Sequence, residues 1–228
     1  MRPEFIETAN VRKFYEICNE LSDPMSMVGP SMAMVTGQAG RGKTEAARHF
    51  AVNADAIYIP PLNIRTPAML LREIAFELVS IRPGRSDACL EIIGSEMNKH
   101  RRLIIIDEAD LLAMSNLEML RNVNERYACP VLLIGEEMLK GKIASRRRLA
   151  SRIRRRMEFT PIQQGDISFF FKQTLTIISA EVAGEIHKFS KGDWRPVLTV
   201  AVGIERAMKA SGLTEIIPEM VSDVIKNT

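Results

Sequence analysis

Gly37-Gln38-Ala39-Gly40-Arg41-Gly42-Lys43-Thr44 is the stretch of sequence that decides the fold. It fits the pattern G-x-x-x-x-G-K-[ST] without a mismatch, which is the pattern of a phosphate-binding loop. The glycines let the backbone curl so that successive N–H groups point at phosphate oxygens. We expect Lys43 to reach the β- and γ-phosphates of a nucleotide and the Thr44 hydroxyl to bind Mg²⁺. All eight residues are therefore candidate nucleotide-binding residues.

The sequence on either side of this loop has the pattern that the motif requires. Residues 32–36 form a short apolar run that predicts a buried strand, and residues 45–51 are good helix formers. A helix in that place directs its positive N-terminal end at the bound phosphates. The alternative, a glycine-rich turn that matches by chance, does not account for both flanks.

A second apolar run ends in two acids. Residues 103–106 are apolar, as in a strand buried on both faces, and Asp107 and Glu108 follow directly. Parallel sheets bind ligands at the carboxyl ends of their strands. We assign Asp107 to Mg²⁺ and Glu108 to the attacking water as general base, and we expect ATP and Mg²⁺ as cofactors. The alternative is a pair of solvated acids at the end of a core strand.

Asp107-Glu108-Ala109-Asp110 also spells the motif of a helicase family. Helicases of that family need two sheet domains, and the remaining chain has no room for a second one. We therefore set that interpretation aside.

The order of strand and helix patterns predicts an α/β fold with a small helical addition. Residues 56–59 and 130–135 read as further strands, and residues 157–160 as a last one, which gives a mostly parallel five-stranded sheet. After residue 160 only helical patterns remain, with Asp166 and Asp193 as caps and a last helix over residues 214–226. We expect a nucleotide-binding domain with an N-terminal helix over residues 1–160 and an all-helical lid domain over residues 161–228.

Composition and charge limit the class of protein. The chain has 228 residues, of which 46% are hydrophobic, and a formal net charge of +3. It has no apolar run as long as a membrane span and no signal-peptide pattern at its N-terminus. Cys18, Cys89 and Cys129 lack metal-binding spacing, so we expect reduced thiols. We expect a cytoplasmic protein of a bacterium or a phage-infected host, with no membrane partner.

Two arginine-containing motifs complete a resemblance to AAA+ ATPases, which combine a phosphate-loop sheet domain with a helical lid. Gly192-Asp193-Trp194-Arg195 resembles the second sensor of that family, which implies that Arg195 reaches the γ-phosphate. Ser151-Arg152-Ile153 resembles the segment that supplies an arginine finger to the neighbouring subunit. Such arginines stabilise charge in the transition state. Arg148 and Arg154 remain alternatives for the finger, and an exposed arginine at a helix start is the alternative for Arg195.

The compact size resembles one AAA+ group, the target-selector ATPases of transposons (phage Mu transposition protein B, IstB and TnsC types). That resemblance implies ATP-dependent, sequence-independent binding of double-stranded DNA, self-assembly into rings or filaments, and a transposase partner. Two features depart from the group. Residues 1–31 are too short for an N-terminal helix-turn-helix domain, and Glu136-Glu137 replace the small polar first sensor after residues 130–135. We therefore expect weak hydrolysis without a partner.

Residues 146–156 hold seven arginines, so the rest of the chain carries a net negative charge. Such a local basic segment predicts contact with DNA phosphates, and the alternative is a solvated helix face with one finger arginine. No aromatic residues are interleaved for base stacking, which favours a duplex over a single strand. The candidate DNA contacts are Lys140, Lys142, Arg146, Arg147 and Arg65.

Two other functions fit the same motifs. The protein could be an AAA+ helper of another machine, such as a helicase loader or an ExeA-type secretion ATPase. It could also be a nucleotide switch that binds only protein. ATP-dependent and salt-sensitive binding to duplex DNA distinguishes the transposition regulator from the secretion ATPase and the protein-binding switch.

Overall fold

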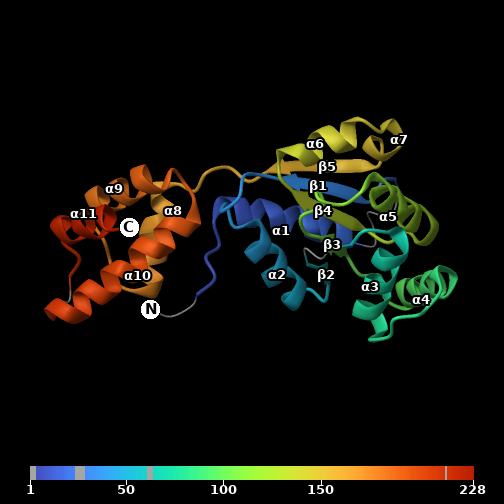
Figure 1. The fold of residues 1–228 in the computed structure, drawn as a ribbon, viewed down its shortest axis with the longest axis horizontal. Coiled ribbons are helices and arrows are strands. Elements are labelled where there is room, and N and C mark those ends of the chain that lie inside the picture. Colours follow the sequence, from blue (N-terminus) through green and yellow to red (C-terminus); the bar gives the residue numbers. More distant parts are fainter. Residues whose placement is uncertain (1–3, 24–28, 61–63, 214) are drawn as a thin grey trace. The chain divides into compact units, whose positions relative to one another are not determined.

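The computed structural model describes residues 4–23, 29–60, 64–213 and 215–228, which fall into two compact units. The sheet unit comprises Val11–Gln38 and Lys43–Phe159, and the helical unit comprises Met1–Asn10, Ala39–Gly42 and Thr160–Thr228 (Figure 1). The division into domains 1–160 and 161–228 stays a prediction, because the units assign the first ten residues and residues 39–42 differently.

The sheet has five strands in the order β2-β3-β4-β1-β5, and every neighbouring pair is parallel. The strands are β1 (Met32–Thr36), β2 (Ile57–Ile59), β3 (Ile104–Ile106), β4 (Val131–Gly135) and β5 (Ile153–Glu158). The expected α/β fold with a parallel five-stranded sheet is therefore confirmed.

The apolar runs form the central strands because both of their faces are covered. Every residue of β1, β3 and β4 is buried, as parallel strands between two helix layers require. In the register Met32 lies beside Val131, and Thr36 lies beside Gly135. The carboxyl ends of β1, β3 and β4 therefore lie at one edge of the sheet, and the candidate loop and the paired acids follow those ends.

Helices connect and cover the strands. Those of the sheet unit are α1 (Ala9–Ser22), α2 (Lys43–Asn53), α3 (Pro67–Val79), α4 (Ser86–Lys99), α5 (Met114–Tyr127), α6 (Glu137–Ala144) and α7 (Arg147–Ala150). The Thr66 hydroxyl accepts a hydrogen bond from the Met69 N–H at 3.3 Å and so caps α3.

Two features of the sheet unit differ from the prediction. β5 begins at Ile153 rather than at residue 157, so the arginines 154–156 lie on an edge strand and not on a helix face. They are exposed, so β5 lacks the alternating pattern that identifies a half-buried strand. The short helix α6 was not predicted, although Leu139 and Ile143 on it are buried at a spacing of four residues.

The helical unit contains α8 (Gln164–Thr174), α9 (Ala180–Ser190), α10 (Trp194–Ser211) and α11 (Pro218–Lys226) around an apolar core. Asp193 caps α10 as predicted. Asp166 is not the N-cap of α8: that residue is Gln163, and the Asp166 carboxylate accepts from the Gln163 N–H at 2.8 Å in a capping box. The last helix begins at Pro218, and residue 214, its predicted start, lies outside the described residues.

Candidate functional site

The predicted phosphate-binding loop has the strand–loop–helix setting that its motif requires. β1 ends at Thr36 and α2 begins at Lys43. Between them Gly40 has a φ of 75° and Gly42 a φ of 89°, a left-handed conformation that glycine adopts without steric cost. The loop backbone therefore depends on these two glycines.

Lys43 is folded back over the loop. It is 9% exposed, and its Nζ donates to the carbonyl oxygens of Gly37 at 2.5 Å and Gln38 at 2.8 Å. An anion bound by the loop would therefore meet a buried positive charge. This placement fits the predicted contact of Lys43 with nucleotide phosphates.

Thr44 and Asp107 lie together at the carboxyl edge of the sheet. The Thr44 hydroxyl donates to Oδ2 of Asp107 at 2.8 Å, and Asp107 is only 4% exposed. A hydroxyl and a carboxylate are the oxygen ligands that Mg²⁺ takes from phosphate-loop proteins. The residues present thus fit the predicted magnesium site.

Tyr58, in β2, is a site residue that the sequence analysis missed. Its hydroxyl donates to the same Oδ2 of Asp107 at 2.8 Å, and the Arg48 guanidinium lies 5.7 Å from the centre of its ring. Burial raises the pKa of Tyr58, and the nearby Asp107 carboxylate raises it further. Tyr58 therefore stays a hydrogen-bond donor at neutral pH. The only sequence signal was a phenol within an apolar strand.

Glu108 is exposed directly after this buried acid. Its backbone has a φ of 48°, which is uncommon for a residue with a side chain, and its N–H donates to Oδ1 of Asp107 at 2.9 Å. Its carboxylate is accessible to water, which a general base requires.

Asp110 connects the loop after β3 to the end of β4. This residue is 9% exposed, and its Oδ1 accepts from the Glu136 N–H at 3.0 Å. Lys142, a predicted DNA contact, donates its Nζ to the carbonyl oxygens of Asp110 and Leu112. The structure thus gives Lys142 a partly buried contact that holds this loop.

The two acids at the expected first-sensor position are exposed and have different surroundings. Glu136 is the N-cap residue of α6 without a capping side chain, whereas Glu137 lies 2.8 Å from Lys140. Lys140, another predicted DNA contact, also lies 2.7 Å from Glu158 of β5. Lys140 is therefore paired with two carboxylates.

Arg152, the predicted finger, follows α7. Its Nε lies 2.7 Å from the Glu125 carboxylate, which Arg121 also contacts at 2.8 Å. Hydrogen bonding to Arg152, followed by Arg121, lowers the pKa of Glu125. Arg154, an alternative finger, lies 3.3 Å from Glu20 of α1.

The remaining candidate arginines are exposed. Arg146 and Arg147 lie at the start of α7, and Arg65 lies directly before the Thr66 cap of α3. Arg195 is the second residue of α10, and its N–H donates to the Asp193 Oδ1 at 2.7 Å. Because Arg195 belongs to the helical unit, its role toward a nucleotide stays a prediction.

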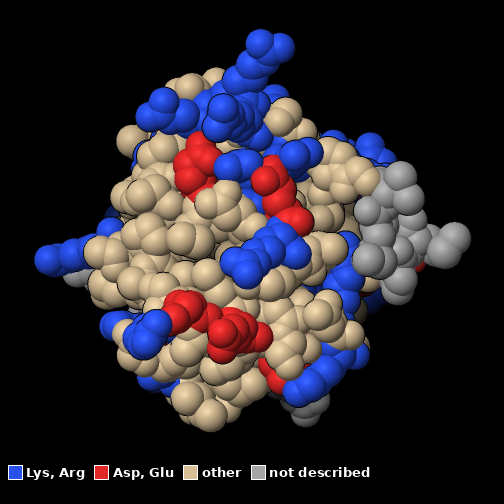
Figure 2. All heavy atoms as spheres, turned by 90° about the vertical axis from the view of Figure 1, so that its right-hand side faces the viewer, with Lys and Arg blue, Asp and Glu red and all other residues tan. Residues whose placement is uncertain are grey.

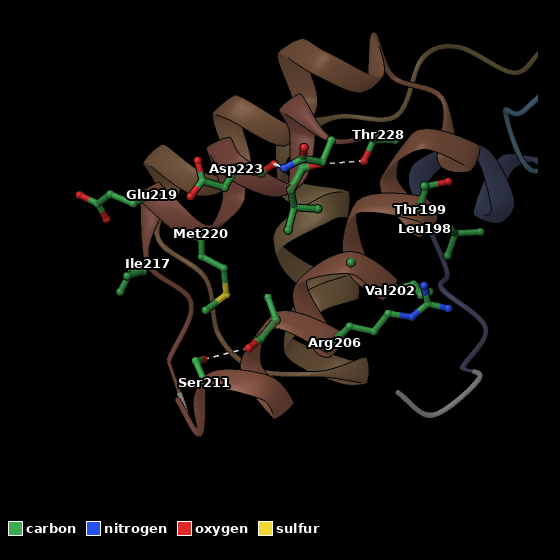
Figure 3. A pocket seen from close by; sticks show the side chains of 14 residues that line it. Leu198, Thr199, Val202, Arg206, Ser211, Ile217, Glu219, Met220, Asp223 and Thr228 are labelled. Atoms are coloured by element: carbon green, nitrogen blue, oxygen red, sulfur yellow. Dashed lines mark hydrogen bonds between the residues drawn. The ribbon is translucent and has the colours of Figure 1, made fainter.

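The helical unit also contains a hollow of about 1060 Å³ between α10 and α11 (Figure 3). Val202 and Arg206 of α10 line it together with Met220 and Asp223 of α11. The phosphate-binding loop is not among the residues that line it, so this hollow is separate from the candidate site.

Other site classes find no support in the part of the chain that the structure describes. No cluster of three or more His, Cys, Asp or Glu side chains there could hold a metal ion. The three cysteines are buried free thiols. Among the described helices none has the length and apolarity that a membrane span needs.

Comparisons with known proteins agree with this geometry. Residues 27–143 match the AAA domain family. The chain is 30% identical over 138 residues to the Mu-like prophage FluMu DNA transposition protein B of Haemophilus influenzae, which covers 59% of this chain and 46% of that protein. It is 28% identical over 174 residues to the ATP-dependent target DNA activator B of Escherichia phage Mu. That match covers 72% of this chain and 54% of the phage Mu protein.

A solved structure shows the same fold. The Aeropyrum pernix ORC2 protein matches with a TM-score of 0.71 and 15% identity, over 99% of this chain and 70% of that one. The chain spans about half the length of the two transposition relatives. The predicted nucleotide-binding ATPase domain and its resemblance to Mu transposition protein B are confirmed. Residues 27–143, which match the AAA domain family, make up just over half of the 228 residues, so the chain belongs to that family.

Proposed function

We propose that this protein is an ATPase that binds double-stranded DNA when ATP is bound, assembles on it as a ring or filament, and regulates transposition in the cytoplasm of a bacterium or a phage-infected host. The observation that carries the ATPase part is the contact of 2.8 Å between Thr44 and Asp107 beside the buried Lys43. The names of the two transposition relatives support the DNA part.

The residues at the sheet edge have separate roles in binding and hydrolysing ATP. Lys43 and the loop N–H groups bind the phosphates, and Thr44 and Asp107 hold Mg²⁺, which neutralises phosphate charge. Glu108 orients a water and accepts its proton. Arg195, and Arg152 from a neighbouring copy, add positive charge at the γ-phosphate. Hydrolysis is slow without a partner because Glu136 and Glu137 replace the small polar first sensor, and because Arg152 acts only on a neighbouring copy.

The DNA contact is best supported at α7. Arg146, Arg147 and Arg148 are exposed, and among the described residues none of them has an acidic partner within ion-pair distance. Lys140 and Lys142 are already engaged. Figure 2 shows Lys and Arg side chains gathered toward the top of one face, where Figure 1 places α7, with acids nearby. Phosphate contact through this segment fits the proposed sequence-independent binding.

The experiment measures binding to a long random-sequence duplex with ATP, ADP or no nucleotide across a salt series, followed by microscopy of the complex. We expect cooperative, ATP-dependent coating that weakens with salt. The double variant R146A/R147A should lower the slope of log affinity against log salt by about one per lost phosphate contact. Lys140→Ala is the matched control, because Lys140 is paired with Glu137 and Glu158.

The outcome also decides between the transposition regulator and two of its rivals, the secretion ATPase and the protein-binding switch. Intact ATP binding without any binding to duplex DNA would refute the proposal and favour an ATPase that acts on protein partners. If DNA binds as expected, the bound complex is the reagent with which to test stimulation of hydrolysis by a transposase, the proposed partner.

A further inference from the structure

Residues 40–42 of the phosphate-binding loop contact the turn that precedes α10 within the helical unit. The Arg41 guanidinium donates through Nη1 to the carbonyl oxygens of Lys191, at 3.0 Å, and Gly192. The Trp194 N–H donates to the Gly40 carbonyl oxygen at 2.9 Å. Side chain and backbone of the loop thus both bind the same turn.

The two partners also fit each other sterically. A Cβ atom on Gly40 would lie 1.9 Å from Oδ1 of Asp193, and one on Gly192 would lie 2.9 Å from Nη1 of Arg41. A Cβ atom on Gly42 would lie 3.4 Å from the Trp194 ring. Each of these three glycines therefore makes room for a side chain of the other partner. An alanine at Gly40 would require the Asp193 carboxylate to shift, and one at Gly192 would require Arg41 and Pro161 to shift.

The turn presents its carbonyl groups because two consecutive residues are left-handed. Lys191 has a φ of 50° and Gly192 a φ of 73°, which ends α9. The Lys191 N–H closes the helix on the His187 carbonyl oxygen, while the Lys191 and Gly192 carbonyls face Arg41. Asp193 then caps α10 through the N–H of Arg195 at 2.7 Å. The position of the Arg195 backbone is thus set by the turn that Arg41 holds.

The phosphate-loop motif itself does not require an arginine at position 41, because that position is one of its variable ones. We infer that Arg41 is a positioning residue: it fastens the turn of residues 191–194 to the loop, so that Arg195 is aligned with the γ-phosphate. This inference rests on the proposed role of Arg195. Both hydrogen bonds come from one nitrogen, Nη1, at the end of the long Arg41 side chain.

The test compares ATP and ADP affinities of the full chain and of the variants Arg41→Ala, Arg41→Lys, Arg195→Ala and R41A/R195A. Trp194 is the only tryptophan of the sequence and lies against the loop, so its fluorescence reports binding, with calorimetry as a second method. We expect Arg41→Ala and Arg195→Ala each to lower the preference for ATP over ADP about tenfold, which is about 1.4 kcal/mol. In the double variant, the preference for ATP over ADP should fall no further than in Arg195→Ala alone.

Losses that add up in the double variant would overturn the inference, because Arg41 would then act independently of Arg195. Arg41→Lys keeps a donor that can reach carbonyl oxygens, as the Lys142 ammonium does, so it should lose less of the preference than Arg41→Ala. A larger loss in Arg41→Lys than in Arg41→Ala would contradict the inference. Arg206→Ala, farther along α10, is the matched control and should change nothing.

A second measurement separates this inference from the proposed role of Arg195. Amide hydrogen exchange of the Trp194 N–H, which is bonded to Gly40, should quicken about tenfold in Arg41→Ala, without any nucleotide. Unchanged exchange would refute the fastening by Arg41. Unchanged ATP preference in Arg195→Ala, together with faster exchange in Arg41→Ala, would instead refute only the role of Arg195.

Discussion

The Tyr58 hydroxyl donates a hydrogen bond of 2.8 Å to Oδ2 of Asp107, the same carboxylate oxygen that accepts from Thr44 at 2.8 Å. Partners that orient a metal-binding residue usually change metal affinity by 10- to 100-fold when they are removed. We therefore predict that Tyr58→Phe raises the Mg²⁺ concentration needed for ATP binding about tenfold. A Mg²⁺ titration of nucleotide binding measures this. Tyr127→Phe, at the end of α5, is the control, and an unchanged requirement in Tyr58→Phe would contradict the prediction.

Glu108 is exposed at the sheet edge, whereas Lys43 is buried over the loop. Glu108→Gln should therefore keep ATP affinity within about twofold and lower turnover at least about 100-fold, because the loss of a general base affects only the chemical step. Lys43→Ala should instead abolish nucleotide binding. Binding and steady-state hydrolysis assays of both variants distinguish these effects. Normal turnover in Glu108→Gln would show that another group activates the water.

Arg152 pairs with Glu125, and both side chains are partly exposed, so this pair contributes little to stability. We predict that Arg152→Ala keeps the melting temperature and ATP affinity but loses hydrolysis, because its proposed target is the ATP of a neighbouring copy. Mixing Arg152→Ala with Glu108→Gln subunits should restore part of the activity. Normal hydrolysis in Arg152→Ala would leave Arg148 or Arg154 as the finger. If Arg152→Ala loses hydrolysis and no mixing ratio restores it, the role of Arg152 toward a neighbouring copy loses its support.

Asn116 lies in α5, is fully buried, and its Nδ2 donates to the Ile64 carbonyl oxygen at 3.1 Å. Asn116→Ala leaves that carbonyl without this donor, which costs about 1–3 kcal/mol of unfolding free energy. In thermal unfolding, the melting temperature should fall by about 2–4 °C for each kcal/mol lost in a chain of this length. Asn122→Ala, at an exposed position of the same helix, is the control, and its melting temperature should fall by less than about 2 °C.

Burial raises the pKa of Cys129 from 9.0 to about 12, although the charge of Arg101 acts in the opposite direction. The folded chain therefore keeps the thiol proton at a pH where the unfolded chain loses it. The resulting contribution to stability is complete below pH 9 and is lost as pH rises from 9 toward 12. Denaturant unfolding across this range should show a steeper loss for the wild type than for Cys129→Ala. Equal slopes would contradict the burial of this thiol.

The sheet and the main site were predictable because each had a local signal. Four apolar residues before Asp107 indicated a strand buried on both faces, and the loop motif fixed the connection between β1 and α2. Asn116 is a polar residue among the apolar positions of α5, yet it is buried there, and its Nδ2 donates to the Ile64 carbonyl oxygen from a distant loop. A tertiary hydrogen bond of this kind leaves no trace in the local pattern.

The contacts that tune the site could not be predicted. Tyr58 and Asp107 are brought together only by the pairing of β2 with β3, and Arg41 meets its carbonyl partners 150 residues along the chain. Lys142 looked like a surface cation, yet its ammonium holds two carbonyl groups. Composition and spacing give the charge of such a side chain, while the fold decides which groups it meets.

The two edge strands of the sheet, β2 and β5, affect how copies of the chain behave when they lie close together. β2 has only three residues, and β5 carries exposed arginines at positions 154–156. Short edge strands and charged side chains on edge strands prevent the sheets of two molecules from pairing through main-chain hydrogen bonds. In the proposed assembly on DNA, where many copies would lie at high local concentration, the copies would therefore stay separately folded and would not pair through their sheet edges.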